Sequence, residues 1–411
     1  MTAFVNVKDF GAIGDGITND TLALQQALNS DWPYLVIPPG VYRVSELLVT
    51  KPKVVIGWGA TLSLIDKAFK MSLVNGFSCE GLTFDGNSFA SGSNGVVVER
   101  SKNVSFKQCH FKGIHLNALH ITHGTGISEN IFVEKCTFDM IGGSGITRSS
   151  QGIALYIQRT RNVRVSDNRI TNVYGQSAVF VLASRDVVIE KNLIEDLTGR
   201  GVQTWAGENS TEADRIYRLI ITNNFIRKCG SLVTNGDGQA TNGIFIRNPR
   251  GEATDVEISG NFIEEVGENF LEGAFVAHNN IMKNSGEYGL VTPSKEGVYP
   301  HANTILASNI IMDTVKEGIK LFGNKKNVKM NDNLILNPGG TGILVQAYGA
   351  GTKMEKIDIS GNLIIDEKGT NKAKIEKVSS NGGVTVGETV TLTDNILYNS
   401  APPAPVVPPV E

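Results

Sequence analysis

The sequence of 411 residues predicts an all-β protein, a parallel β-helix solenoid of about 11 or 12 coils with a short N-terminal capping helix. Three observations predict it. One polar position recurs at spacings of about 20 to 35 residues, short strands of alternating polarity surround each copy, and helical periodicity is confined to the N-terminus. A repeat of this length holding three short strands is typical of one coil, because only stacked coils bury their apolar side chains.

The recurring position is an asparagine or a cysteine shortly before an Ile, Leu or Phe. An asparagine in a buried turn satisfies backbone groups and bonds the asparagine one coil away. A cysteine fills the same slot as a small apolar side chain. We expect the slot to contain Asn87, Cys109, Cys136, Asn168, Asn192, Asn224, Asn261, Asn279, Asn309, Asn333, Asn362 and Asn395.

A second repeat, a small residue followed by alternating apolar positions, marks one strand of each coil, as in Gly152–Tyr156 and Gly243–Arg247. The residue after the small one faces the core and the next faces outward. The strands therefore share an outer surface, called here the glycine-strand face. Its expected outward residues are Glu99, His120, Thr122, Tyr156, Gln158, Phe180, Gln203, Trp205, Phe245, Arg247, Lys320, Phe322 and Gln346.

The two ends of the chain differ from its middle. Residues 1–50 contain a predicted helix, Thr21–Leu28, that Asn19 and Asp20 can cap. Leu22, Leu24 and Leu28 give this helix an apolar surface that covers the N-terminal end of the solenoid, as a terminal cap must. Residues 51–397 form the predicted β-helix, and residues 398–411 are Pro-rich and indicate an extended tail or linker.

Composition excludes several classes of function. The chain has 38 basic and 41 acidic residues, which gives no indication of a nucleic-acid partner. No apolar stretch approaches the length of a membrane span, and the start of the sequence does not resemble a signal peptide. The four cysteines match no metal or disulfide pattern, so we expect buried free thiols at Cys79, Cys109, Cys136 and Cys229.

The N-terminus carries a motif in three pieces, Asn6-Val-Lys-Asp-Phe-Gly-Ala-Ile-Gly-Asp15-Gly, then Gln25-Gln-Ala-Leu28, then Ile37-Pro-Pro-Gly-Val-Tyr42. It resembles the opening of the pectate lyase superfamily, which includes glycoside hydrolases, mannuronan C-5 epimerases and phage tailspike depolymerases. The resemblance implies a right-handed parallel β-helix that acts on or binds a polysaccharide. It also implies an extracellular or virion-associated location and, from the tailspikes, a homotrimer.

The catalytic signatures of these families are not matched. The epimerase stretch Tyr-Gly-Phe-Asp-Pro-His has its nearest counterpart here in Asn117-Ala-Leu-His-Ile-Thr-His123, which keeps a histidine but not the Asp-Pro-His order. The Asn-Thr-Asp and Asp-Asp pairs of polygalacturonases and the Asp-His signature of pectate lyases are absent. The resemblance therefore implies the fold and the class of ligand without assigning one reaction.

Two kinds of chemistry remain open on the glycine-strand face. β-Elimination or C-5 epimerisation of a uronic acid needs a base and an acid, for which His120 and Tyr156 are candidates. We place them on adjacent coils, offset by two residues, and Arg247 or a bound Ca²⁺ can neutralise the sugar carboxylate. His115 and His123 flank His120, but their spacing matches no standard metal site.

Glycoside hydrolysis instead needs two carboxylates. Glu99 lies on the expected face, and Glu208 and Asp237 lie in long segments that we expect to wall a groove, 206–215 and 231–241. Sugar rings have apolar faces and hydroxyl rims, which aromatic side chains next to charged and amide groups suit. The substrate-binding candidates are Trp205, Gln158, Gln203, Phe245, Lys320 and His123.

The sequence thus favours an enzyme that degrades an extracellular polysaccharide, as a lyase or a glycoside hydrolase. One alternative is an enzyme resembling mannuronan C-5 epimerases, which changes a uronic-acid polymer without cutting it. Another is a non-catalytic spike or adhesin that only binds glycan, which the neutral outward residues Val97, Ala154 and Leu344 favour.

Overall fold

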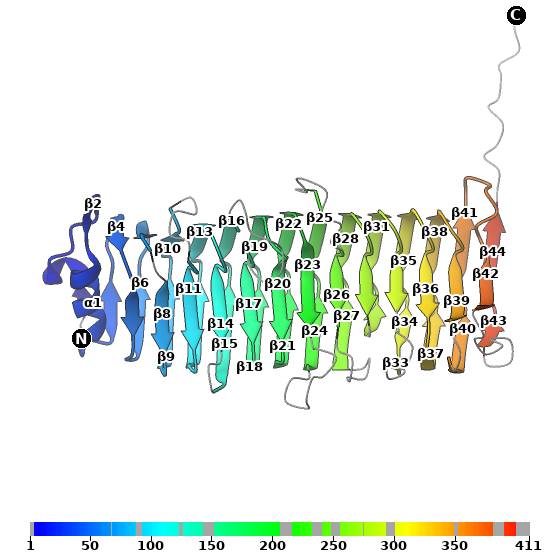
Figure 1. Ribbon diagram of the computed structural model, residues 1–411, viewed down its shortest axis with the longest axis horizontal. Coiled ribbons are helices and arrows are strands. Elements are labelled where there is room, and N and C mark those ends of the chain that lie inside the picture. Colours follow the sequence, from blue (N-terminus) through cyan, green and yellow to red (C-terminus); the bar gives the residue numbers. More distant parts are fainter. Residues whose placement is uncertain are drawn as a thin grey trace, which may run out of the picture. The chain divides into compact units, whose positions relative to one another are not determined.

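The computed structural model (Figure 1) describes residues 4–66, 68–87, 93–122, 126–142, 152–205, 216–231, 241–247, 255–273, 275–292, 301–348, 352–380 and 390–399. These residues form parallel strands, one α-helix and one short 3-10 helix. The chain divides into two compact units. The first contains Met1–Gly251 with Asp255–Gly267, and the second contains Glu252–Thr254 with Glu268–Glu411.

The first unit contains three parallel sheets, and most coils contribute one strand to each sheet. Sheet A contains β1 (Phe4–Asn6), β3 (Tyr34–Val36), β6 (Lys53–Ile56), β9 (Asn75–Glu80), β12 (Lys102–Lys107), β15 (Ser128–Glu134), β18 (Thr160–Ser166), β21 (Arg185–Glu190), β24 (Tyr217–Thr222) and β27 (Val256–Ser259). Sheet B contains β2 (Asp15–Asn19), β4 (Gly40–Val44), β7 (Ala60–Leu64), β10 (Thr83–Asp85), β13 (His110–Ile114), β16 (Thr137–Ile141), β19 (Arg169–Val173), β22 (Leu193–Leu197), β25 (Phe225–Cys229) and β28 (Phe262–Val266). Sheet C contains β5 (Leu47–Val49), β8 (Phe69–Ser72), β11 (Val96–Glu99), β14 (Leu119–Thr122), β17 (Leu155–Gln158), β20 (Ser177–Leu182), β23 (Arg200–Trp205) and β26 (Ile244–Ile246).

The second unit repeats the same three-sheet arrangement. Its sheet A strands are β30 (Val276–His278), β33 (His301–Ala302), β34 (Ile305–Ala307), β37 (Lys325–Asn331), β40 (Met354–Ser360) and β43 (Val390–Thr393). Its sheet B strands are β31 (Ile281–Ser285), β35 (Ile310–Thr314), β38 (Leu334–Pro338), β41 (Leu363–Asp366) and β44 (Ile396–Asn399). Its sheet C strands are β29 (Leu271–Gly273), β32 (Leu290–Thr292), β36 (Ile319–Phe322), β39 (Ile343–Tyr348) and β42 (Ile375–Ser380).

The fold is the right-handed parallel β-helix that the sequence predicts, the hand expected of parallel strands joined by crossovers. Parallel pairing already includes β1, β3 and β4, within the segment where we expected the N-terminal motif and cap. Inward positions align from coil to coil, as in the stacked rings of Phe84, Phe111 and Phe138, whose centroids are 5.1 and 4.7 Å apart. This alignment makes the continuous apolar core.

The asparagine ladder is confirmed in both units. The side-chain amide of Asn168 donates to Oδ1 of Asn192 at 2.9 Å, and Asn192 donates to Asn224 at 2.9 Å. The same amides donate to backbone carbonyl groups, as Asn192 does to Val165 at 3.0 Å. Buried turns are thereby satisfied without water. In the second unit the ladder contains Asn280, Asn309, Asn333, Asn362 and Asn395.

Two positions predicted for the ladder were wrong. Asn280, not Asn279, donates to Asn309, and Asn279 adopts a positive φ of 56° beside it. Asn87 is exposed, and the coil before Cys109 places Leu82 in the slot. Two adjacent asparagines made the first assignment ambiguous, and an apolar residue in the slot leaves no polar repeat to detect. Cys136 does occupy the slot, because its backbone N–H donates to Asn168 Oδ1 at 2.8 Å.

The four cysteines are buried and free, as predicted. The Sγ atoms of Cys79 and Cys109 lie 3.8 Å apart. Burial raises the pKa of the Cys229 thiol to about 12, so it stays protonated. These thiols act as small apolar core side chains.

Helix α1 (Thr21–Asn29) forms the predicted cap, with Leu24 and Leu28 buried. Leu22 is 71% exposed, contrary to the expectation that it joins the apolar surface. Asn19, one residue before the N-cap position, accepts the Thr21 N–H at 3.0 Å. Asp20 does not cap the helix; its carboxylate accepts the N–H groups of Ile13 and Gly14, at 2.7 and 3.0 Å, and holds the preceding loop.

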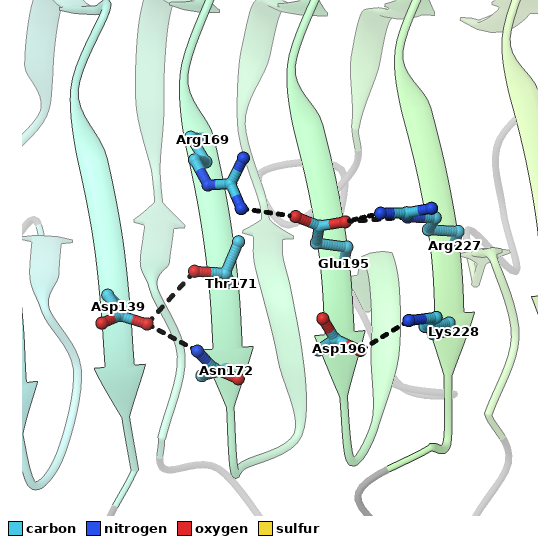
Figure 2. Close-up of polar contacts among 8 residues, drawn as sticks. All are labelled: Asp139, Arg169, Thr171, Asn172, Glu195, Asp196, Arg227 and Lys228. Carbon is cyan, nitrogen blue, oxygen red and sulfur yellow. Dashed lines mark hydrogen bonds and ion pairs between the residues drawn. The ribbon is translucent and has the colours of Figure 1, made fainter.

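Polar contacts between coils stabilise the outer face of sheet B (Figure 2). The carboxylate of Glu195 on β22 accepts from Arg169 on β19 at 2.7 Å and from Arg227 on β25 at 2.5 Å. On the neighbouring position, Asn172 donates to Asp139 at 2.7 Å. Each of these contacts joins side chains of adjacent coils. The charged groups in them therefore stabilise the stacking of the coils.

The described residues contain no helix long and apolar enough to cross a membrane. Tyr398 and Asn399, which we assigned to the tail, belong to strand β44, and residues 400–411 lie outside the described residues.

Candidate functional site

The glycine-strand face is the outer surface of sheet C, and strand pairing in the first unit aligns its side chains into rows. One row contains Lys70, Val97, His120, Tyr156, Phe180, Gln203 and Phe245. A second row contains Ser72, Glu99 and Thr122, and farther along Gln158, Leu182 and Trp205. The glycine repeat predicted the members of these rows, but Ala154 and Leu344, which we expected to face outward, are buried.

His120 and Tyr156 are directly paired in the sheet register, so the predicted two-residue offset was wrong. Their rings stack with centroids 4.6 Å apart and planes inclined by 19°. Phe180 continues the stack, with its centroid 5.2 Å from that of Tyr156. Parallel pairing places equivalent positions about 4.8 Å apart, so aromatic residues there must stack.

Burial sets the protonation of this pair. It lowers the pKa of His120 to about 4, against a smaller opposing effect of a hydrogen bond with Gln158. It also raises the pKa of the Tyr156 hydroxyl. At neutral pH the imidazole is therefore uncharged and the phenol keeps its proton, which are the forms that a general base and a general acid require.

One nitrogen of His120 lacks a partner. Its Nε2 atom is buried and makes no hydrogen bond to any of the described residues. A buried polar atom without a partner is costly, because it has lost its water and gained nothing in exchange. In this conformation the burial also keeps a ligand away from the atom.

Gln203 lies in the His120 row, but its side chain is fully buried. Arg200 covers this part of the face: its Nη1 donates to Gln203 Oε1 at 3.1 Å, and its guanidinium carbon lies 4.4 Å from the Phe245 ring centroid. Gln203 therefore positions Arg200 by this hydrogen bond and lies beside Phe245 in the row. In this conformation it has no exposed atoms that a ligand could contact.

Trp205, which is exposed, and Arg247, which is half-buried, form a pair at the far end of the first unit. The guanidinium carbon of Arg247 lies 3.9 Å from the Trp205 ring centroid, and Trp205 is 37% exposed. Arg247 follows β26, four strands from the β14 strand of His120, or about 19 Å at the usual strand spacing. Arg247 is therefore too far away to neutralise a carboxylate held at His120, contrary to our expectation.

Glu99 and Lys70 form the charged group nearest to His120 along the rows. Lys70 Nζ lies 2.9 Å from Glu99 Oε2, and Arg100 lies 3.7 Å from the other carboxylate oxygen. Lys70 stands two strands from His120 in the same row, about 10 Å away at the strand spacing. The sequence prediction missed this cation, although Ala68 before its strand is a small residue of the kind that the repeat allows.

Lys320 lies on sheet C of the second unit. Its Nζ is 3.2 Å from the Tyr288 hydroxyl and lies over the rings of Tyr288 and Phe322, at 4.7 and 5.7 Å. Lys316 also lies over Tyr288 and forms an ion pair with Glu287 at 2.5 Å. Tyr288 was not predicted, because it precedes the glycine of its strand. The cluster combines aromatic rings with cations, a chemistry suited to an acidic sugar.

Three predicted site residues, His123, Glu208 and Asp237, lie outside the described residues, as do most of the predicted groove walls. Among the described residues, no group of three or more His, Cys, Asp or Glu side chains can hold a metal ion. We therefore assign no Ca²⁺ ligands on the described face.

The family model "Rhamnogalacturonase A/epimerase, pectate lyase-like" matches residues 4–230, more than half of the chain. The matched segment contains every described residue of the His120 row from Lys70 to Gln203.

Two curated relatives match parts of the chain. The pre-neck appendage protein of Bacillus phage phi29 is 28% identical over 180 residues, which cover 35% of this chain and 21% of the relative. The mannuronan C5-epimerase AlgE5 of Azotobacter vinelandii is 31% identical over 107 residues, which cover 20% of this chain and 11% of the relative. The chain thus spans about a fifth or less of the length of these relatives.

Solved structures share the fold. The N-terminal fragment of gene product 12 of bacteriophage phi29 superimposes with a TM-score of 0.59 and 14% identity, covering 94% of this chain and 74% of that one. The surface adhesin PfbA of Streptococcus pneumoniae gives 0.57 and 15% identity, covering 83% and 91%. At these identities the likeness shows the β-helix alone.

Proposed function

Because the chain belongs to the rhamnogalacturonase A/epimerase, pectate lyase-like family, whose β-helix is a carbohydrate-active fold, we propose that it cleaves a uronic-acid polysaccharide by β-elimination at His120 and Tyr156. The observation that carries the proposal is the stacked pair itself. A neutral imidazole and a protonated phenol stand side by side on one face of sheet C. Each is in the form that its role requires at neutral pH.

The reaction balances with these two groups. His120 takes the proton from C-5 of the uronic acid, and the electrons of that bond form the C4–C5 double bond. The C4–O bond breaks, and the leaving oxygen takes the proton of the Tyr156 hydroxyl. Proton transfer from the imidazolium to the phenolate, directly or through water, restores both groups. The products are an unsaturated uronate end and a new reducing end.

The placement of the pair supports elimination over epimerisation. Both side chains project from the same face of the sheet, so they approach a sugar ring from one side. Elimination can remove the C-5 proton and protonate the leaving oxygen from that side. Epimerisation must return a proton to the opposite face of C-5, which two side chains on one side of the ring do not reach together.

Cations along the face suit an acidic polymer. Lys70 lies in the row of His120, two strands away, and suits a carboxylate of the bound polymer only in exchange for its ion pair with Glu99. Arg247 over Trp205, and Arg200 over Phe245, suit further sugars of the chain by combining a ring surface with a positive charge. Hydrolysis has less support, since Glu99 is paired with Lys70 and the other candidate carboxylates, Glu208 and Asp237, are undescribed.

A second candidate function is glycan binding without cleavage. The burial of His120 Nε2 favours it, because a base must reach its proton. The structural likeness to a pneumococcal surface adhesin supports the same alternative. With the phage appendage relative, it also supports an extracellular or virion-associated location. The homotrimer stays a prediction.

Incubation with a panel of uronic-acid and neutral polysaccharides tests the proposal. Elimination produces the ultraviolet absorbance of the new C4–C5 double bond together with reducing ends. Reducing ends without that absorbance indicate a hydrolase, and inverted C-5 stereochemistry by NMR without cleavage indicates an epimerase. Retention of polysaccharide with none of these changes indicates a binding protein. Each of the last three results overturns the proposed reaction.

A further inference from the structure

The outer face of sheet A contains a shallow pocket of about 300 Å³ that the proposed reaction on sheet C does not use. Strands β3, β6, β9 and β12 form its floor, near the N-terminal end of the first unit; β6 and β9 are labelled in Figure 1. The side chains that matter for its chemistry are Pro33, Tyr34, Pro52, Ser78, Asn103 and Ser105.

The register of sheet A explains why a hollow forms here. One outward row runs from Tyr34 through Val54, Ser78 and Ser105 to Phe132. Three small side chains occupy consecutive coils, and an aromatic residue stands at each end of the row. Val54 and Ser105 are about 10 Å apart at the strand spacing, enough for one sugar ring between the aromatic ends.

The polar groups of the pocket are hydroxyls and amides. Ser105 Oγ donates to Ser78 Oγ of the adjacent coil at 2.9 Å. Beside the floor, a second asparagine ladder runs along the surface: Asn103 donates to Asn75 at 2.7 Å, and Asn130 donates to Asn103 at 2.8 Å. The ladder takes one of the two N–H groups of each donating amide, which leaves a second donor on each side chain.

Backbone conformation accounts for part of this ladder. Asn103 and Asn130 adopt φ values of 54° and 57°, a region that asparagine tolerates better than most residues. The positive φ angles of these asparagines do not explain why two serines and Tyr34 lie beside them. The combination of a ring, hydroxyls and amides in one hollow is the chemistry that recognises a sugar.

The pocket offers no accessible charged side chain, which favours a neutral ligand. Lys53 is the only charged residue among the lining side chains, and its Nζ donates to the carbonyl groups of Ser30, at 2.5 Å, and Trp32. It is buried and directed away from a ligand. A uronate would thus lose its hydration and find no cation here, unlike on the face that carries Lys70 and Arg247.

We propose that this pocket binds a neutral sugar ring of a glycan, separately from the reaction on sheet C. The apolar face of the ring lies against Tyr34, and its hydroxyls bond to Ser78, Ser105 and the Asn103 amide. Such a site would hold the protein on a glycan through a part of the polymer that it does not cleave. It stands whether or not the proposed elimination is correct, because the two faces share none of these residues.

The test uses the full chain and the methyl glycosides of glucose, galactose and mannose, with methyl glucuronide as the charged comparison, by saturation-transfer difference NMR. We expect at least one neutral glycoside to bind with a millimolar Kd, as suits one ring in a shallow site. Tyr34→Ala, and Ser105→Leu, which fills the floor, should each weaken binding about tenfold or more.

Matched variants separate loss of the site from loss of the fold. Tyr34→Phe keeps the ring and should bind within a few-fold of the wild type. Val188→Ala, in the same outward row of β21 but beyond the pocket, should leave binding unchanged. Thermal unfolding of each variant reports whether it folds.

Three results would overturn the proposal. One is that no neutral glycoside binds the wild-type protein. Another is a preference for methyl glucuronide, and the third is unchanged binding in the Tyr34→Ala and Ser105→Leu variants. His120→Ala should retain neutral glycoside binding, so a loss there would place the observed binding on sheet C.

Discussion

The imidazole of His120 lies against the phenol ring of Tyr156, with 4.6 Å between centroids, because the two residues are paired in neighbouring strands of sheet C. Burial of this stack keeps the imidazole neutral and the phenol protonated at neutral pH. The pair therefore needs no change of protonation before it acts on a sugar.

Substitution of the pair should remove elimination without unfolding the protein. We expect His120→Ala to lower kcat by about 10³-fold, and Tyr156→Phe, which keeps the stack but removes the acid, by about 10²-fold. The formation of unsaturated ends measures both. Lys107→Ala, an exposed change on sheet A, serves as the control and should keep full activity. Equal activity in all three variants would contradict the assignment.

The low pKa of His120 predicts a dependence of stability on pH. The folded state has a pKa of about 4 and the unfolded state one of about 6.5, so between these values the unfolded chain binds more protons. Stability should be fully present above pH 6.5 and fall by about 2 kcal/mol as the pH drops to 5. Urea unfolding of the wild type and His120→Gln measures the difference, which should shrink on acidification. A constant difference would show that the ring titrates normally.

Lys325 predicts a change at alkaline pH. It is fully buried in the second unit, its Nζ donates to the Phe322 carbonyl at 2.8 Å, and burial lowers its pKa to about 7. The unfolded chain binds more protons between pH 7 and about 10.4, so the wild type should gain stability across that range. Lys325→Met lacks this gain, and chemical unfolding of both proteins at pH 7 and pH 9 compares them. Parallel behaviour of the two proteins would mean that the amine is solvated.

The buried asparagine ladder should matter more than the exposed one. Asn192→Ala removes the partner of the Asn168 amide and leaves the Val165 carbonyl unpaired, so we expect a loss of about 3 kcal/mol. Asn103→Ala, in the surface ladder, should cost about 0.5 kcal/mol because water replaces the lost bond. Equilibrium urea unfolding gives both values. Similar losses would indicate that the ladder stabilises only through backbone conformation.

We expect the cysteine thiols to be unreactive in the folded state. All four are buried and free, and burial raises the pKa of Cys229 to about 12. A thiol-specific chromogenic reagent should therefore react with none of them in the native protein and with four in denaturant. Fast reaction of the native protein would show that a coil opens near a cysteine.

The site depends on register, and the sequence predicted part of it. Alternation after each small residue placed His120, Tyr156 and Trp205 on one outer face, because side chains of a strand alternate strictly between its two faces. The sequence did not predict the direct alignment of His120 with Tyr156. That alignment depends on the chain length consumed in the turns between coils, which has no fixed pattern. The distance of Arg247 from His120 followed from the same register.

The sequence alone determined the coil and its core, since the ladder from Asn168 to Asn261 and the alternating apolar strands are local patterns that admit one way of stacking. It misplaced Asn279 and Asn87, where neighbouring residues offered two registers or an apolar residue filled the slot. Only the tertiary structure decided which side chains meet across coils, such as Lys70 with Glu99 and Tyr34 with the Ser78–Ser105 floor. Such contacts join residues some 20 to 70 positions apart, and their chemistry depends on burial that no local pattern encodes.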